Sequence, residues 1–184
     1  METAAQRLAA WEKTHQEWTE RIRRDPTKVG VPTLEQIAGR SGLEIFTGML
    51  QGELPAPPIS ETLDFFLVEA ERGRVVFQGR PSGRIYNPLG TVHGGWFATL
   101  LDSAVACAVQ SCLPAGKSYT TLELKVNIVR ALTTKVPLVR AEGKVVHLGG
   151  QVATADGKLV GPDNRLYAHA STTCLIFDFP PGPR

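Results

Sequence analysis

The sequence has few cysteines, no secretory signal and no metal-binding motif, and each absence narrows the class of protein. Its 184 residues include three cysteines, Cys107, Cys112 and Cys174, which are odd in number and lack metal-ligand spacing. The N-terminus has mixed charges in place of a basic patch followed by an apolar run. We therefore expect reduced thiols in a cytoplasmic protein, with no bound metal or cofactor.

Charge and hydropathy exclude two kinds of partner. The net charge of +2 is too small to indicate nucleic acid or an anionic membrane as the main partner. The longest weakly polar stretch, residues 85–116, contains His93, Asp102, several glycines and Pro114, which argues against a membrane span. With 42% apolar and 21% charged residues, the composition is that of a soluble globular protein of one domain.

The first third of the chain is expected to be helical and its middle to be extended. A short helix is predicted around residues 33–39, with Thr33 as its N-cap. Residues 48–60 are rich in proline and glycine and are expected to form an extended connector. A longer amphipathic helix is predicted over residues 3–24 from apolar positions spaced by three and four: Leu8, Trp11, His15, Trp18 and Ile22.

The second part of the chain has the pattern of strands around one helix. A hairpin is predicted for residues 62–80, followed by a loop at 81–95 and a helix of about five turns at 95–113. Strands are expected at 120–131, 136–148, 151–160 and 165–177; in the first of them Leu122, Leu124, Val126 and Ile128 would share one face. This order predicts an α+β fold, in which an antiparallel sheet wraps the apolar helix.

Asp102 is the only formally charged side chain between Arg84 and Lys117. A carboxylate in so apolar a helix is costly to desolvate unless it is paired or used. A solvent-facing position, or burial with backbone donors, would explain it without a function. Because the residues on both sides of the helix are apolar, an exposed face is hard to find, and the functional interpretation is favoured.

The start of the same helix carries a second signal. Gly94 and Gly95 leave its first backbone N–H groups uncrowded and unpaired, and His93 precedes them. With the helix dipole, these donors suit a carbonyl oxygen that becomes an oxyanion. Each feature alone is more often structural, but their adjacency to the apolar helix points to chemistry.

Gly94 and Asp102 are eight residues apart, which is roughly 12 Å along one helix. One substrate carbonyl cannot lie within about 3 Å of both groups. If both act on one bond, the second must come from another chain placed antiparallel. The sequence thus predicts a composite site at a two-fold interface.

The pattern of Asn87, Gly90, His93-Gly94-Gly95 and Asp102 resembles the PaaI-type thioesterases of the hotdog superfamily. The likeness covers about residues 60–178. It implies a hotdog fold, with a long helix wrapped by a curved antiparallel sheet, and a homodimer that is often doubled into a tetramer. The implied organisation is a helical extension at 1–47, the connector at 48–60 and a hotdog domain at 61–179.

The resemblance implies hydrolysis of an acyl-CoA thioester and gives roles to four residues. Asp102 matches the catalytic carboxylate, acting as nucleophile or as general base. Gly94 matches the backbone N–H that polarises the thioester carbonyl. Asn87 matches the residue that positions the nucleophile or water across the interface, and His93 supports the loop and the thioester sulfur side. A thioester carbonyl is electrophilic enough to be opened in this way without a metal.

Four further residues are expected near the substrate. Thr121 stands where the family places a Ser or Thr beside the acid, and its neighbour Thr120 is an alternative because the register is uncertain by one. Gly95 lies beside the oxyanion donor. Trp96 is a candidate for lining the acyl pocket, although core packing would explain it equally well.

Two other functions remain open. A hotdog hydratase or dehydratase would need a His paired with an acid, and a non-catalytic acyl-CoA-binding protein would need no acid in the helix. The residues that bind the CoA phosphates are also open. Arg80, Arg84, Lys117 and Arg130 are candidates, and nothing in the sequence separates them from solvated surface charge.

Overall fold

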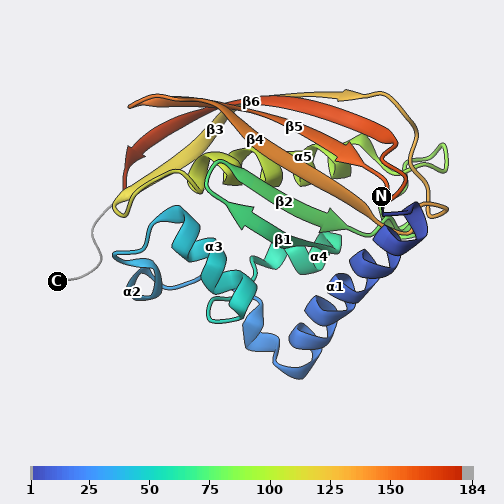
Figure 1. The fold of residues 1–184 in the computed structure, drawn as a ribbon, viewed down its shortest axis with the longest axis horizontal. Helices are drawn as coiled ribbons and strands as arrows, with labels where there is room; N and C mark the ends of the chain where they lie inside the picture. Colours follow the sequence, from blue (N-terminus) through green and yellow to red (C-terminus); the bar gives the residue numbers. More distant parts are fainter. Residues whose placement is uncertain (1, 180–184) are drawn as a thin grey trace.

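A computed structural model describes residues 2–179 as helices arranged around one curved sheet (Figure 1). The helices are α1 (Ala4–Arg24), α2 (Leu34–Ile37), α3 (Gly42–Gln51), α4 (Pro58–Leu63) and α5 (Gly94–Gln110), with short 3₁₀ turns η1 (Pro26–Lys28) and η2 (Gly83–Ile85). The strands are β1 (Phe65–Glu71), β2 (Arg74–Gly79), β3 (Lys117–Ile128), β4 (Val139–Leu148), β5 (Val152–Val160) and β6 (Leu166–Asp178).

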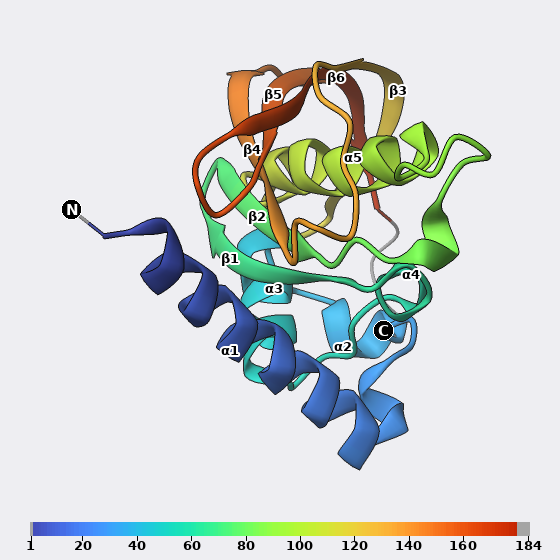
Figure 2. The same cartoon turned by 90° about the vertical axis from the view of Figure 1, so that its right-hand side faces the viewer.

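The six-stranded sheet has the order β1-β2-β4-β5-β6-β3, and every neighbouring pair is antiparallel. It curves around α5, which lies along its concave face (Figures 1 and 2). The inward side of α5 is apolar and fully buried at Leu100, Leu101 and Val105. The α+β hotdog fold expected from the sequence is therefore confirmed.

Glycines in the sheet let the backbone of α5 come close to the strands. A Cβ at Gly143 of β4 would overlap the carbonyl oxygen of Ala104. A Cβ at Gly157 of β5 would lie 2.5 Å from Cγ1 of Val105. Any larger residue at these two positions would push the helix away from the floor of the sheet.

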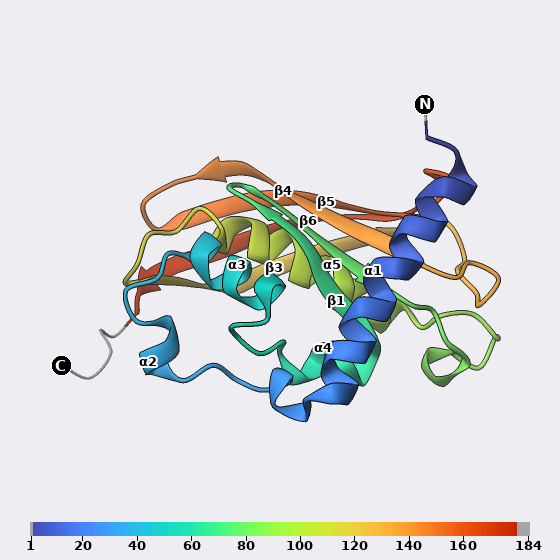
Figure 3. The same ribbon diagram turned by 60° about the horizontal axis from the view of Figure 1, so that its bottom comes forward.

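Helix α1 covers the outer face of β1, β2 and β4, on the side of the sheet away from α5 (Figure 3). The Trp11 carbonyl accepts a hydrogen bond of 2.8 Å from Gln78 Nε2, and the Arg140 guanidinium lies 4.7 Å from the centre of the Trp11 ring. Trp18 stacks on Phe66 with ring centres 5.5 Å apart. The apolar stripe predicted for this helix is confirmed, because Trp11, Trp18 and Ile22 are buried.

The extended structure expected for residues 48–60 is limited to the middle of that segment. Helix α3 occupies its start and α4 its end, so the prediction is wrong at both ends. A capping box between Ser41 and Glu44 begins α3, and its Gly42 packs directly against the carbonyl of Gln110 at the end of α5. The helix was missed because this contact needs a glycine in its first turn, where propensity disfavours one.

Strand β3 contains a bulge that alters the expected alternation. The pairing with β6 shifts between Thr121 and Glu123, so Leu122 is an extra residue and its side chain is 59% exposed. The expectation that Leu122 shares the inner face with Leu124 and Val126 is therefore wrong. Thr121 points inward instead, which has consequences for the site described below.

The close approach of α5 to the sheet predicts different effects for two glycine-to-alanine changes. Gly143→Ala should lower the free energy of unfolding by at least about 2 kcal/mol, because the new methyl group meets rigid backbone. Gly150→Ala, where nothing lies within 4 Å of the new atom, should change it by less than about 0.5 kcal/mol. Urea unfolding of both variants measures this; equal stabilities would contradict the described packing.

Candidate active site

The first turn of α5 leaves one backbone donor open. His93 is the N-cap residue, and its Nδ1 accepts a hydrogen bond of 2.9 Å from the Gly95 N–H. The ring proton of a neutral His93 therefore lies on Nε2. The Gly94 N–H has no hydrogen-bond partner within the described part of the chain. The structure thus separates the two glycines: Gly95 is capped, and Gly94 is free to bind a negative atom.

The loop before α5 is held in one shape by Asn87. Its Oδ1 accepts hydrogen bonds from the N–H groups of Leu89 (2.9 Å) and Thr91 (3.2 Å), and its Nδ2 donates to Thr91 Oγ1 (2.9 Å). The backbone of Asn87 also pairs with Thr91. These bonds make a tight projecting turn, visible as the light green loop beside the start of α5 (Figure 2).

A groove of about 350 Å³ lies between this loop, the start of α5 and the end of β3. Gly94 and Asn87 both line it, so a ligand in the groove would lie beside the residue that carries the open N–H. Phe97 and Ile128 contribute apolar side chains to its lining, and Arg130 contributes a cation. The remaining lining residues are Thr91, Val92, Val129 and Ala131.

Asp102 projects from the middle of α5 toward β3. Its Oδ1 accepts a hydrogen bond of 3.1 Å from Thr121 Oγ1, which faces it because of the bulge in β3. Desolvation by the surrounding protein raises the pKa of the Asp102 carboxyl above its usual range, while the Thr121 hydrogen bond lowers it. Within residues 2–179, no basic side chain forms an ion pair with Asp102.

The other polar groups in the seam between α5 and β3 are neutral. Desolvation raises the pKa of the Cys107 thiol to about 12, and it raises the pKa of the Tyr119 hydroxyl well above its usual value. The two side chains lie near each other, with Sγ 3.9 Å from the hydroxyl oxygen. Asp102 is therefore a carboxylate set among uncharged groups, an environment that makes it a stronger base.

The structure settles where the remaining predicted residues lie. Thr120 is exposed on the outer side of β3 and does not contact Asp102, so the register places Thr121 at the acid. Trp96 is 3% exposed and its Nε1 donates a hydrogen bond of 2.9 Å to the Leu63 carbonyl. Its ring packs against Gly79, where a Cβ would lie 2.7 Å from it, so Trp96 belongs to the core and does not line the groove.

The open N–H of Gly94 and the carboxylate of Asp102 lie apart within one chain. The helix is continuous from Gly94 to Gln110, and eight residues correspond to roughly 12 Å. The groove at Gly94 does not include Asp102 among its lining residues. One chain therefore presents two separate candidate half-sites: an open N–H beside a groove, and a carboxylate with its threonine.

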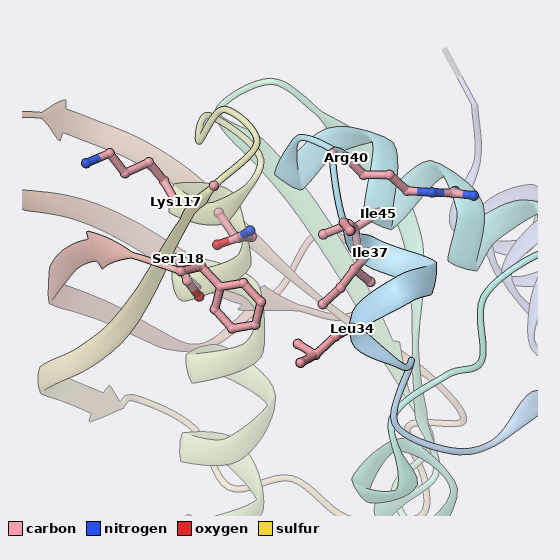
Figure 4. Close-up of a pocket in the computed structure, with 11 residues that line it drawn as sticks. Leu34, Ile37, Arg40, Ile45, Lys117 and Ser118 are labelled. Atoms are coloured by element: carbon pink, nitrogen blue, oxygen red, sulfur yellow. The ribbon is translucent and has the colours of Figure 1, made fainter. Parts of the chain in front are cut away.

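A smaller pocket of about 80 Å³ lies at the other end of α5, where the N-terminal helices meet the start of β3 (Figure 4). Leu34, Ile37 and Ile45 line one side, opposite Lys117 and Ser118. It shares no lining residue with the groove at Gly94. Among residues 2–179, no group of three His, Cys, Asp or Glu side chains is placed to hold a metal ion, and no helix has the length and hydropathy to cross a membrane.

Comparisons with known proteins find similarity to enzymes that hydrolyse thioesters. The model of the thioesterase superfamily matches residues 89–168, which contain Gly94, Asp102 and Thr121. A curated relative, the 1,4-dihydroxy-2-naphthoyl-CoA hydrolase of Listeria monocytogenes, is 21% identical over 64% of this chain and 94% of its own length.

Solved structures agree with the fold. A protein of Ralstonia eutropha related to phenylacetic acid degradation has a TM-score of 0.65 and 29% identity, over 71% of this chain and 98% of its own. The PaaI protein of the phenylacetic acid degradation operon of E. coli has a TM-score of 0.64 and 17% identity, over 74% of this chain and 93% of its own.

The raised pKa of Asp102 predicts a pH-dependent gain in stability for Asp102→Asn. The pKa of the Asp102 carboxyl is higher in the folded chain than in the unfolded chain, where it is about 4. Its contribution to the free energy of unfolding is therefore fully present below about pH 4 and is lost as the pH rises through the folded-state pKa. The amide variant should therefore have a higher Tm than the wild type at pH 7 and the same Tm at pH 3. Thermal scans at both values measure this; a lower Tm at pH 7 would show that the carboxylate is favourably paired.

Proposed function

We propose a specific reaction for this thioester hydrolase, whose residues 89–168 match the model of the thioesterase superfamily. The reaction is hydrolysis of an acyl-CoA to the free acid and CoA, at a site that two copies of the chain share. One observation carries this proposal. The helix that bears the desolvated carboxylate of Asp102 also bears, at Gly94, an N–H without a partner among the described residues, and Gly94 lines a groove.

The Gly94 N–H is proposed to bind the thioester carbonyl oxygen. As the carbonyl carbon becomes tetrahedral, this oxygen gains negative charge, which the N–H and the helix dipole stabilise more than they stabilise the ground state. The hydrogen bond from Gly95 to His93 fixes the first turn, so the donor is oriented before substrate arrives. Asn87 lines the same groove, where we propose that it helps to position the attacking group.

The Asp102 carboxylate is proposed to promote attack on the carbonyl carbon by one of two routes. As a general base it takes a proton from water, whose oxygen bonds to the carbon; the C–S bond then breaks and the thiolate leaves with a proton from solvent. As a nucleophile its oxygen bonds to the carbonyl carbon, the C–S bond breaks and the thiolate leaves with a proton from solvent; water then hydrolyses the resulting anhydride and restores the carboxylate. Both routes need the ionised carboxylate, and both use the Thr121 hydroxyl to orient it.

A second copy is proposed to unite the half-sites by an antiparallel pairing of α5. If Gly94 lies opposite Asp102 of the partner subunit, the two-fold axis passes midway, at Ala98. Ala98, Thr99 and Ser103 are half-buried in the single chain and are small, so two helices can approach closely there. Between Gly94 and Asp102, the helix residues that are not buried in the single chain, Gly95, Ala98 and Thr99, are all small.

The edge of the sheet supports the same axis. Strand β3 is the last in the sheet order, so one side of its twelve residues has backbone groups without a strand partner. Gly94 lies beside Ile128, and Asp102 beside Thr121, so the middle of the helix corresponds to residues 124–125 of the strand. Pairing two β3 strands about Leu124 places Glu123 opposite Lys125 of the partner subunit, a favourable contact made twice.

The carboxylate is tested first by Asp102→Ala. Wild type should release free thiol from at least one acyl-CoA in a panel of aromatic and aliphatic thioesters. The variant should lose at least about a hundredfold in kcat, since no other ionised carboxylate is available at the site. Asp156→Ala, which removes an exposed aspartate from β5, is the matched control and should keep full activity.

The result also separates the remaining functions. Undiminished hydrolysis by Asp102→Ala would sink the mechanism. Tight binding of acyl-CoA by the wild type without thiol release would favour a binding protein, and addition of water to an unsaturated acyl group would favour a hydratase.

The shared site is tested by mixing two inactive variants. Gly94→Pro removes the N–H at the first helical position, which accepts proline, and His93 already has the extended backbone that a residue before proline needs. We expect a loss of about a hundredfold or more for Gly94→Pro alone. After subunit exchange with Asp102→Ala, half of the dimers are mixed and each has one intact site, so about a quarter of wild-type activity should return.

The control for this experiment is Gly94→Ala, which keeps the N–H. Its methyl group would meet only the flexible end of the Ile128 side chain, at 3.3 Å, so most activity should remain. No recovery on mixing two folded, dimeric variants would contradict a site built from two chains. A monomeric wild type with full activity would contradict it as well.

A further inference from the structure

One hydroxyl on the inner face of β6 stands in a row of otherwise less polar side chains. The inward residues of this strand are all buried: Ala168, Ala170, Thr172, Cys174 and Ile176. Thr172 is 2% exposed and is the one residue of the row with a hydroxyl. Valine has nearly the same shape and carries no polar atom. Because a buried hydroxyl costs free energy unless it is hydrogen-bonded, the Thr172 hydroxyl calls for a partner.

The partner of the Thr172 hydroxyl is the bulge in β3. Its Oγ1 donates a hydrogen bond of 2.7 Å to the carbonyl oxygen of Glu123, the residue that directly follows the extra residue Leu122. A bulge disrupts the ladder of backbone hydrogen bonds locally, so a side-chain donor adds support where the ladder is weakened. The hydroxyl of Thr172 thus ties β6 to the irregular part of β3.

The bulge decides which residues of β3 face α5. After the bulge the even-numbered Leu124 packs inward, whereas before it the odd-numbered Thr121 does. Side chains of a regular strand alternate between its faces with period two, so without the extra residue Leu122 would be inward and Thr121 outward. The hydrogen bond of 3.1 Å from Thr121 to Asp102 therefore exists only because the bulge is there.

A thiol beside both threonines shows that they belong to one cluster. Cys174 of β6 pairs with Thr121 across the two strands. Desolvation raises the pKa of the Cys174 thiol, and hydrogen bonding by the hydroxyls of Thr172 and Thr121 lowers it. Both hydroxyls thus lie next to the same sulfur atom. Within the described residues, only Thr121 hydrogen-bonds to Asp102 itself.

We propose that Thr172 is a positioning residue for the reaction, because its hydroxyl holds the bulge that turns Thr121 toward the Asp102 carboxylate. The inference rests on the proposed function, since it takes Asp102 to be the group that promotes attack on the thioester. Thr172 contacts neither the carboxylate nor the substrate. Its effect reaches the acid through the backbone of β3 and then through the Thr121 hydroxyl.

The test removes the hydroxyl and keeps the shape of the side chain, in Thr172→Val. Valine is favoured in strands, so the variant should fold. Thr172→Ala removes the same hydroxyl from a smaller side chain and should behave alike, whereas Thr172→Ser keeps a donor. The matched control is Thr173→Val, because the hydroxyl of Thr173 reaches only the side chain of Glu123, at 3.5 Å.

For Thr172→Val we expect kcat to fall about tenfold or more at pH 7, with KM within about twofold, because a misoriented carboxylate slows the chemical step. Thr172→Ser and Thr173→Val should each keep at least about half of the wild-type kcat. In a Thr121→Val background, adding Thr172→Val should lower kcat by less than about twofold, because the hydroxyl that it positions is already gone. An undiminished kcat in Thr172→Val would overturn the proposal, as would an equal loss in Thr173→Val or a further tenfold loss in the Thr121→Val background.

The groups that face Asp102 make its own titration easy to follow. They are Cys107 on α5, Tyr119 on β3 and Cys174 on β6, and desolvation raises the pKa of each, so all three stay neutral while the carboxyl titrates. Among the described residues no charged side chain shifts the pKa of Asp102. A change in that pKa therefore reports on desolvation and on the Thr121 hydrogen bond.

Carbon-13 NMR of the Asp102 carboxyl, identified by its loss in Asp102→Asn, separates this inference from the proposed reaction. The Thr121 hydrogen bond lowers the pKa of Asp102, so Thr172→Val should raise it, as Thr121→Val does, and should move the acidic limb of the kcat profile to higher pH. If the wild type hydrolyses no thioester but this pKa rises in Thr172→Val and not in Thr173→Val, the proposed reaction fails and the action of Thr172 on Asp102 stands. An equal pKa in wild type and Thr172→Val refutes the inference whatever the activity.

Discussion

The contact between α5 and the floor of the sheet is the constraint on which the site depends. At Gly143 and Gly157 the helix lies so close to the strands that no side chain fits between them. This contact fixes the position of the helix along and across the sheet. Since the helix carries both the open N–H and the carboxylate, one packing interaction determines where both half-sites lie relative to β3.

The distribution of charge follows the same organisation. The carboxylate lies in the seam between α5 and β3, where the thiol of Cys107 and the hydroxyl of Tyr119 stay neutral. Among the described residues that line the groove at Gly94, Arg130 is the one cation and none is acidic. Within the described part of one chain, no cation pairs with Asp102 to lower its pKa and weaken it as a base. The proposed antiparallel pairing would bring Asp102 of the partner subunit to the groove that Arg130 lines.

Most of the fold could be predicted from the sequence, because periodicity over long segments is a strong signal. The apolar stripe of α1 and the uncharged stretch around Asp102 both correspond to helices in the structure. Helix α3 was missed because Gly42 is required by a contact with Gln110 that only the folded chain makes. The exposed position of Leu122 was missed for a related reason: a bulge depends on pairing with β6, which no local pattern reveals.

The site was predictable in its residue types and less so in its geometry. Spacing predicts that Gly94 and Asp102 belong to separate half-sites, and in the structure the two residues lie eight positions apart on one continuous helix. The choice between Thr120 and Thr121 needed the register of β3. Trp96 lies in the core because its indole N–H and its ring meet Leu63 and Gly79, which are remote in sequence. The sequence could not show that the Gly95 N–H is capped while the Gly94 N–H is open, because the cap depends on the side-chain orientation of His93.

The single helix between the half-sites has a consequence for how this chain can vary. Substitutions at residues 95–101 change side chains, but inserting or deleting one residue there would turn Asp102 by about 100° and shift it by about 1.5 Å relative to Gly94. The carboxylate would then leave Thr121, and in a symmetric pair the error would occur at both sites at once. The number of residues in this segment therefore sets the distance and angle between Gly94 and Asp102, and it is constrained more strictly than the identity of most residues within it.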